Sequence, residues 1–354
     1  MVIAILILLF GILVFVSIAL LNRGQTQRRR HRGGTSGPGR QPLYEDGPLP
    51  EALGIQPDLP LSPAVERLEQ ALAGDFPAML RERVQRKHPQ MTTSEFNWKF
   101  LELKRYFLMT AILKDVPMFS EAVDDIWHEM LMFTREYHRF SEAFVGSVIH
   151  HAPHSGGEPD PGGRAWFDWV YANLFIPTPY SSRIWTPFFR YPLDRGRLEE
   201  LRVADEAELA DRLFNRKAAE RYPEIGETIS RLIRKATEQA ADAETGAVYS
   251  AEKPAHDSAS YMPYLAGALI VYSAADFGDF DDLMAQHYAE EEARRREQEH
   301  AASSSSGCGS SGGSGSWDDD RGGGGSDDGG SSSGGSSSGC SSSSCSSGCG
   351  GGGD

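Results

Sequence analysis

An aspartate and a histidine four residues apart form the most chemically suggestive pair in this 354-residue chain. Asp124 and His128 lie in the segment AVDDIWHEML, and residues at this spacing share one face of a helix. A carboxylate beside an imidazole can orient a histidine tautomer, act in proton transfer, or supply two ligands to a metal ion. The pair is therefore half of a candidate site, and the other half must come from elsewhere in the chain.

The available imidazoles follow in the segment IHHAPH, which contains His150, His151 and His154. A loop after a helix stop could return them toward Asp124 and His128. Zinc usually takes three or four nitrogen, oxygen or sulfur ligands, so the pair and one or two of these histidines would be sufficient. If these residues form a metal site, we predict that it holds a divalent metal such as Zn²⁺. Its ligands would be Asp124, His128, His150 and His151.

A structural role is the competing explanation for the same residues. Trp127 belongs to an apolar stripe, which is typical of a core residue. The segment lacks an H-x-x-x-H or H-E-x-x-H pair, and this favours a hydrogen-bonded structural role for His128. We predict no catalytic residue, because the chain has no G-x-S-x-G elbow, no Walker loop and no G-x-G-x-x-G between a strand and a helix. The balance leans toward a protein that is not an enzyme.

Helices are the elements that would position these side chains. Apolar residues recur at helical spacing on both sides of the Asp124 segment, and each run begins or ends at a residue that favours a helix terminus. The predicted boundaries are Ser62 with Pro63, Thr92 with Glu95 in a capping box, Ser120 as an N-cap, Thr134 as a further start, and Gly146 as a stop.

The second half of the chain gives weaker signals. Residues 166–191 are dense in aromatic side chains and are interrupted by prolines, so we expect only short regular structure there. Residues 205–217 and 223–242 are expected to form two amphipathic helices, and residues 261–272 a buried helix or strand. The predicted fold class is mainly α, with a helical domain over residues 59–300 that includes an irregular aromatic and proline-rich segment.

The two ends of the chain differ from this domain in composition. Residues 1–21 carry no charge and are long enough to cross a hydrocarbon core of about 30 Å, and arginines follow them. This predicts a transmembrane helix over residues 1–22 that contacts the lipid bilayer and leaves the domain on the cytoplasmic side. A basic linker rich in proline and glycine is expected over residues 23–58. A disordered tail rich in serine, glycine and cysteine is expected over residues 301–354.

The net charge of −15 argues against a nucleic-acid partner, which needs a basic surface. The leading functional prediction is a single-pass protein of the cell membrane that acts as a tethered interaction or scaffold module with an unidentified protein partner. The alternative is a metal-binding protein or a metal-dependent hydrolase that uses the Asp124, His128, His150 and His151 cluster.

The segment VDDIWHEMLMFTREYHRF, followed by GSVIHHAPH, resembles the signature region of the glycine-rich domain-containing proteins, which are best known in plants and have bacterial relatives. The family pattern is Val-Asp-x-x-Trp-His-x-His, then a tyrosine, a glycine and a histidine. It maps onto Val123, Asp124, Trp127, His128, Tyr137, Gly146 and His150 or His151. Met130 replaces the second histidine of the Trp-His-x-His unit, which weakens a metal site built on that pair. The resemblance implies a shared domain without an assigned activity.

Overall fold

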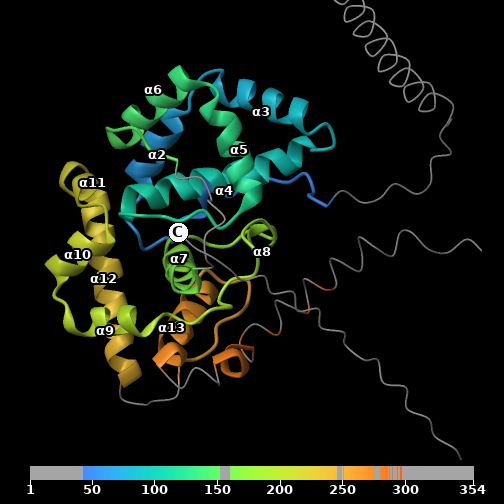
Figure 1. The fold of residues 1–354 in the computed structure, drawn as a ribbon. Helices are drawn as coiled ribbons and strands as arrows, with labels where there is room; N and C mark the ends of the chain where they lie inside the picture. The colour runs from blue at the N-terminus through green and yellow to red at the C-terminus, as the bar shows by residue number, and fades with distance from the viewer. Residues whose placement is uncertain are drawn as a thin grey trace, which may run out of the picture. The chain divides into compact units, whose positions relative to one another are not determined.

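The computed structural model describes residues 43–151, 160–244, 249, 251–274, 280–285, 287, 289, 293 and 296. Helices make up the regular structure of this part of the chain (Figure 1). Its only strand-like pairings are two isolated bridges, Ile55 with Phe175 and Leu113 with Phe214. The predicted mainly α fold is therefore confirmed for the described residues.

The helices nearest the candidate site come from the first half of the chain. They are α2 (Ser62–Ala71), α3 (Phe76–Lys87), α4 (Thr93–Ile112), α5 (Glu121–Leu131) and α6 (Thr134–Val145). Helix α5 packs against α3, α4 and α6, while α2 packs against α4 and α6. Helix α2 begins at Ser62, one residue before the predicted start, because Leu61 and not Ser62 is its N-cap. The predicted start at Thr92 is confirmed, since its side chain accepts a hydrogen bond from the Glu95 amide at 3.1 Å. Helix α3 was not among the predicted elements.

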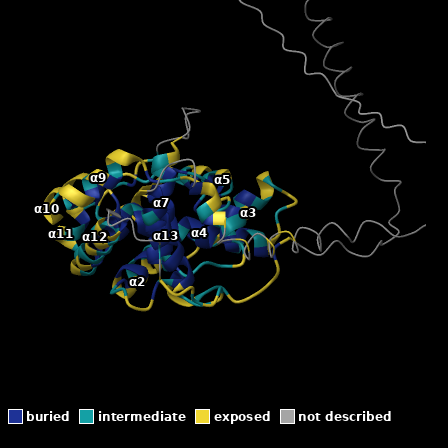
Figure 2. Cartoon of the chain, turned by 90° about the horizontal axis from the view of Figure 1, so that it is seen from below, coloured by how far each residue is buried: buried dark blue, intermediate teal, exposed yellow. Residues whose placement is uncertain are grey.

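The second half adds seven helices of very different length within the described residues. They are α7 (Pro161–Leu174), α8 (Ser181–Ile184), α9 (Arg195–Val203), α10 (Glu206–Leu213), α11 (Arg216–Arg221), α12 (Pro223–Glu244) and α13 (Tyr261–Ala274). Helix α13 packs on both α7 and α12. Figure 2 shows α4, α7 and α13 as mostly buried and α10 and α11 with more exposed residues. The segment expected as one helix over residues 205–217 is divided into α10 and α11.

The aromatic segment contains a long helix, which corrects the prediction of short regular structure. Helix α7 has 14 residues, and every residue from Arg164 to Leu174 is buried. Asp160 caps it by accepting a hydrogen bond from the Gly163 amide at 2.7 Å, and Pro161 occupies its first turn. The interrupting prolines begin at Pro177, beyond the end of the helix. Helix α7 shows no apolar stripe because it is covered on all sides.

The packed region also begins earlier than the predicted boundary at residue 59. Tyr44, Leu53 and Gln56 are buried, and residues Glu51–Gly54 form a short 3-10 helix, η1. Arg105 of α4 donates a hydrogen bond to the Leu53 carbonyl at 2.9 Å. The last part of the predicted linker is thus held by a side chain about fifty residues further along the chain.

No helix in the described part of the chain is long and apolar enough to cross a bilayer. Helix α13 is apolar, but its 14 residues rise only about 21 Å, whereas a hydrocarbon core is about 30 Å thick. Helices α4 and α12 are longer, but both carry charged residues along their length.

This finding corrects the prediction of a single-pass protein of the cell membrane, and with it the membrane-tethered interaction or scaffold module, neither of which the structure supports. The predicted span over residues 1–22 and the predicted tail over residues 301–354 lie outside the described residues.

Candidate metal centre

Helix α5 presents the predicted aspartate and histidine together. Ser120 caps the helix by accepting a hydrogen bond from the Val123 amide at 3.2 Å. Val123, Ile126 and Trp127 are buried, so the apolar stripe faces the core as predicted. Asp124 and His128 lie one turn apart, and His128 Nδ1 is 3.4 Å from Asp124 Oδ2.

The third member of the site arrives from the loop after α6. That helix ends at Gly146, which has a φ of 82°, a left-handed conformation that favours glycine. The chain then returns toward α5, and His151 Nε2 lies 2.6 Å from Asp124 Oδ1. The rings of His128 and His151 are 4.5 Å apart between centroids. One carboxylate therefore contacts two imidazoles that come from different parts of the chain.

The spacing of these side chains is close to that of a metal site. One ligand atom from each of Asp124, His128 and His151 can be chosen so that all three lie within 4.8 Å of one another. Zinc–nitrogen and zinc–oxygen bonds of about 2.0–2.2 Å at tetrahedral angles place neighbouring ligand atoms about 3.4 Å apart. The 3.4 Å contact of His128 with Asp124 already has this separation. The 2.6 Å contact of His151 with Asp124 would have to lengthen by about 0.8 Å, which a side-chain rotation can supply.

The site is sheltered on one side and open on the other. The exposed fraction of the side chain is 7% for His151, 15% for Asp124 and 47% for His128. The His151 ring meets the edge of the Trp127 ring at 4.4 Å between centroids and an interplanar angle of 82°. An ion held by the three residues could therefore be reached by solvent beside His128.

The remaining predicted ligands are placed differently. His150 is exposed and does not belong to the group of converging ligand atoms, although it adjoins His151 in the sequence. His154, the further histidine considered from the sequence, lies outside the described residues. Of the four predicted ligands, the structure brings together Asp124, His128 and His151 and leaves His150 apart.

Sequence reasoning missed the contacts that surround this cluster. The Trp127 indole donates a hydrogen bond to the Tyr137 hydroxyl at 3.1 Å, and that hydroxyl donates to the Ile149 carbonyl at 2.6 Å. The resemblance to the glycine-rich family contained a signal, since it singled out both aromatic residues. Burial raises the pKa of Tyr106, which packs on Trp127, and the negative charge of Asp124 raises it further.

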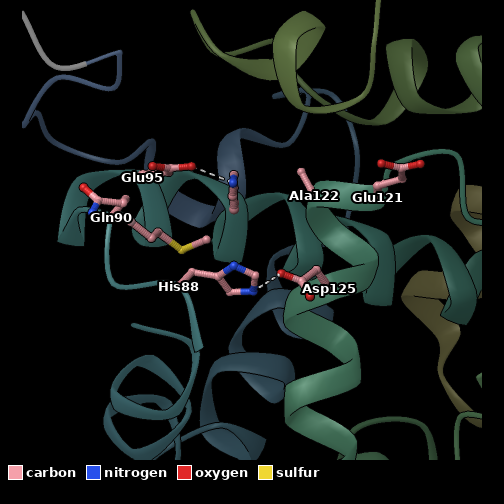
Figure 3. Close-up of a pocket in the computed structure, with 8 residues that line it drawn as sticks. His88, Gln90, Glu95, Glu121, Ala122 and Asp125 are labelled. Atoms are coloured by element: carbon pink, nitrogen blue, oxygen red, sulfur yellow. Dashed lines mark hydrogen bonds and ion pairs between the residues drawn. The ribbon is translucent and has the colours of Figure 1, made fainter. Parts of the chain in front are cut away.

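The neighbouring aspartate faces a separate ionic cluster on the other side of α5. Asp125 contacts Lys87 at 2.8 Å and His88 at 2.6 Å, both at the end of α3. Figure 3 shows His88 and Asp125 pointing toward each other in a hollow of about 580 Å³, with Glu95 and Glu121 on opposite sides. Within the described residues, the ligand atoms that converge for a metal belong to the Asp124 side and not to this hollow.

Comparison with known proteins gives a family without an assigned function. Residues 66–157 match a family model described as UCP032817-like. This match covers less than half of the chain and includes Asp124, His128 and His151. No curated protein and no solved structure matches the chain. The resemblance to the glycine-rich domain-containing proteins stays a prediction.

Proposed function

We propose that the domain binds one divalent metal ion through Asp124, His128 and His151. The observation that carries this proposal is the convergence of three ligand atoms within 4.8 Å, two from adjacent turns of α5 and one from a distant loop. Carboxylate and imidazole groups form the common ligand sets of zinc and of non-haem iron. Two of the three ligands are well sheltered, so they hold a defined geometry.

A three-residue ligand set leaves at least one coordination position for another group. Structural zinc sites are usually closed by four protein ligands, whereas catalytic sites keep a position for water or substrate. A metal in such an open position supplies a bound water of lowered pKa or polarises a bound oxygen. His128 is half-exposed, so the open side of this site faces solvent. We therefore favour a centre that binds an exogenous ligand over a purely structural ion.

We also propose that the chain is related to the glycine-rich domain-containing proteins. The residues that carry the resemblance include Asp124, Trp127, His128 and Tyr137, and in the fold they surround one site. A pattern that follows one spatial cluster supports relatedness better than a pattern scattered over the surface. The replacement of the second histidine by Met130 does not disturb the proposed ligand set, because Met130 is buried in the core and residues two apart on a helix, such as His128 and Met130, do not share a face.

The adjacent histidines provide a direct test of metal binding. The full chain is purified, loaded with Co²⁺ or Zn²⁺, and its bound metal is measured by elemental analysis and by the visible absorption of Co²⁺. One equivalent of metal is expected for the unmodified chain and for His150→Ala, with a large loss for His151→Ala. Absence of stoichiometric metal in the unmodified chain, or equal losses in both variants, would refute the proposal.

A further inference from the structure

We propose that Tyr137 and Trp127 are positioning residues that set the place of His151 in the metal centre. This inference rests on the proposed function, because it concerns the same ligands. The proposed ligands are Asp124, His128 and His151, whereas the Tyr137 hydroxyl is bonded to Trp127 and to the Ile149 carbonyl. They act on His151: Tyr137 through the backbone of its loop, and Trp127 through its ring.

The positioning contact is a hydrogen bond to the loop that carries His151. The Tyr137 hydroxyl donates to the carbonyl of Ile149 at 2.6 Å, two residues before the histidine. Between described residues, the backbone of residues 147–151 makes no other hydrogen bond. The Tyr137 hydroxyl therefore restrains the backbone of this loop, in addition to the contact of His151 with Asp124, and its loss would loosen the segment that holds His151 in place.

The indole of Trp127, on α5, forms a hydrogen bond with the same Tyr137 hydroxyl. A tyrosine hydroxyl has one proton and two lone pairs. Tyr137 gives its proton to Ile149 and accepts a hydrogen bond from Trp127 Nε1 at 3.1 Å. The same Trp127 ring contacts the His151 ring at 4.4 Å. Trp127 thus contacts both the histidine and the hydroxyl that fixes its loop.

Burial helps the Tyr137 hydroxyl to keep the proton that it donates. Tyr137 and Trp127 are only 2% and 1% exposed. Burial raises the pKa of Tyr137 to about 12, so the hydroxyl keeps its proton near neutral pH and remains a donor to the carbonyl. The hydrogen bond also gains from the low dielectric of its surroundings.

The hydrogen bond from Tyr137 to Ile149 lies next to two histidines that differ in exposure. Ile149 is buried, His150 is exposed, and the His151 side chain is 7% exposed. Exposure thus alternates along these three residues, so a hydrogen bond that holds Ile149 inward also favours an inward His151. The hydroxyl of Tyr137 therefore selects which of two adjacent histidines reaches Asp124.

The test compares Tyr137→Phe with Tyr264→Phe in the full chain. Tyr264→Phe is the matched control, because it removes a hydroxyl that bonds to His287 at 2.8 Å, away from the metal centre. Co²⁺ and Zn²⁺ affinities are measured by titration and by competition with a chelator, together with the Co²⁺ absorption spectrum. Loss of outer partners of metal ligands typically lowers affinity about 10–100-fold. That loss, with an altered spectrum, is expected for Tyr137→Phe, whereas Tyr264→Phe should retain both.

The outcomes separate the two proposals. Wild-type affinity and an unchanged spectrum in Tyr137→Phe would overturn the positioning role, provided that His151→Ala still abolishes binding. Absence of metal from the unmodified chain would overturn the metal centre itself. If Tyr137→Phe does not fold, Trp127→Phe gives the second measurement, because it removes the indole N–H but keeps an aromatic ring. A weaker affinity in the same direction is expected there, and an unchanged one would overturn the role.

Discussion

Replacement of Arg105 by methionine is expected to destabilise the domain by about 3–5 kcal/mol, the usual cost of breaking a buried ion pair from one side. Arg105 and Glu102 of α4 are both fully buried, with Arg105 Nη1 3.3 Å from Glu102 Oε1. Methionine can fill much of the space of the arginine stem, but it cannot balance the carboxylate. The perturbation therefore tests the charge and its hydrogen bonds more than the volume.

The contacts of the pair refine this magnitude. Arg105 also donates to the carbonyls of Leu53 and Ile176, each at 2.9 Å, and both acceptors would lose a donor. A buried polar group without its partner costs about 1–3 kcal/mol. Against this, Glu102 keeps three neutral donors in the variant. They are Ser181 at 2.8 Å, Tyr171 at 2.7 Å and Trp185 at 2.8 Å. These donors partly stabilise the carboxylate, so the expected loss stays within the 3–5 kcal/mol range despite the two carbonyls.

Urea unfolding followed by circular dichroism measures this loss. Glu102→Gln should cost less than Arg105→Met, because Arg105 would keep its two carbonyl acceptors. The double variant Glu102→Gln/Arg105→Met should be more stable than the sum of the two single losses predicts, since it leaves no uncompensated charge. A loss below about 1 kcal/mol for Arg105→Met, or strict additivity in the double variant, would refute the reasoning.

Two other substitutions test the turn and the ion pairs around the site. Gly146→Ala should cost about 1–2 kcal/mol in urea unfolding and should weaken Co²⁺ binding, because φ is 82° at the turn that returns His151 to α5. Burial alone would raise the pKa of Glu129, but hydrogen bonds from Lys87 and Arg83 lower it below its usual range. Their contribution is complete above the unfolded carboxyl pKa of about 4.3 and is lost as pH falls through the lower folded value. Glu129→Gln should therefore cost about 1.5–3 kcal/mol at pH 7, and thermal unfolding should show the difference from wild type narrowing below about pH 4.

Each of these predictions has a clear contradicting result. Gly146→Ala with unchanged stability would show that the turn tolerates a Cβ. That result would also require the Arg221 guanidinium to move, because its Nη1 atom overlaps the position of the added carbon. For Glu129→Gln, a difference from wild type that stays constant between pH 7 and pH 3 would remove the ionic explanation.

Local signals located the helices of the site well. Ser120 and the apolar stripe of α5 were sufficient to place Asp124 and His128 on one face, because capping and four-residue spacing act within a single helix. Gly146 also ended α6 as predicted. These features depend on short stretches of sequence, and the fold does not override them.

Burial from distant parts of the chain explains the failures. Helix α7 has no exposed face to give its sequence a helical period, because every residue from Arg164 to Leu174 is buried and α13 packs against it. Its only local signals were Asp160 and Pro161, which favour a helix start. Residues 44–56 appeared to be linker because their proline content predicts irregular backbone. That backbone is irregular, but Arg105 and the aromatic core hold it in place.

The choice between His150 and His151 shows most clearly where sequence reasoning ends. Both are histidines in the same loop, and the ligand preferences of a metal do not distinguish them. The difference comes from the Tyr137 hydroxyl, which bonds to the Ile149 carbonyl at 2.6 Å and thereby fixes the alternation of buried and exposed side chains. The hydroxyl that makes this bond also accepts a hydrogen bond from Trp127 of α5. The identity of the third ligand is therefore a property of the packed core, and the tryptophan and tyrosine of the family-like pattern belong to the metal centre as much as its ligands do.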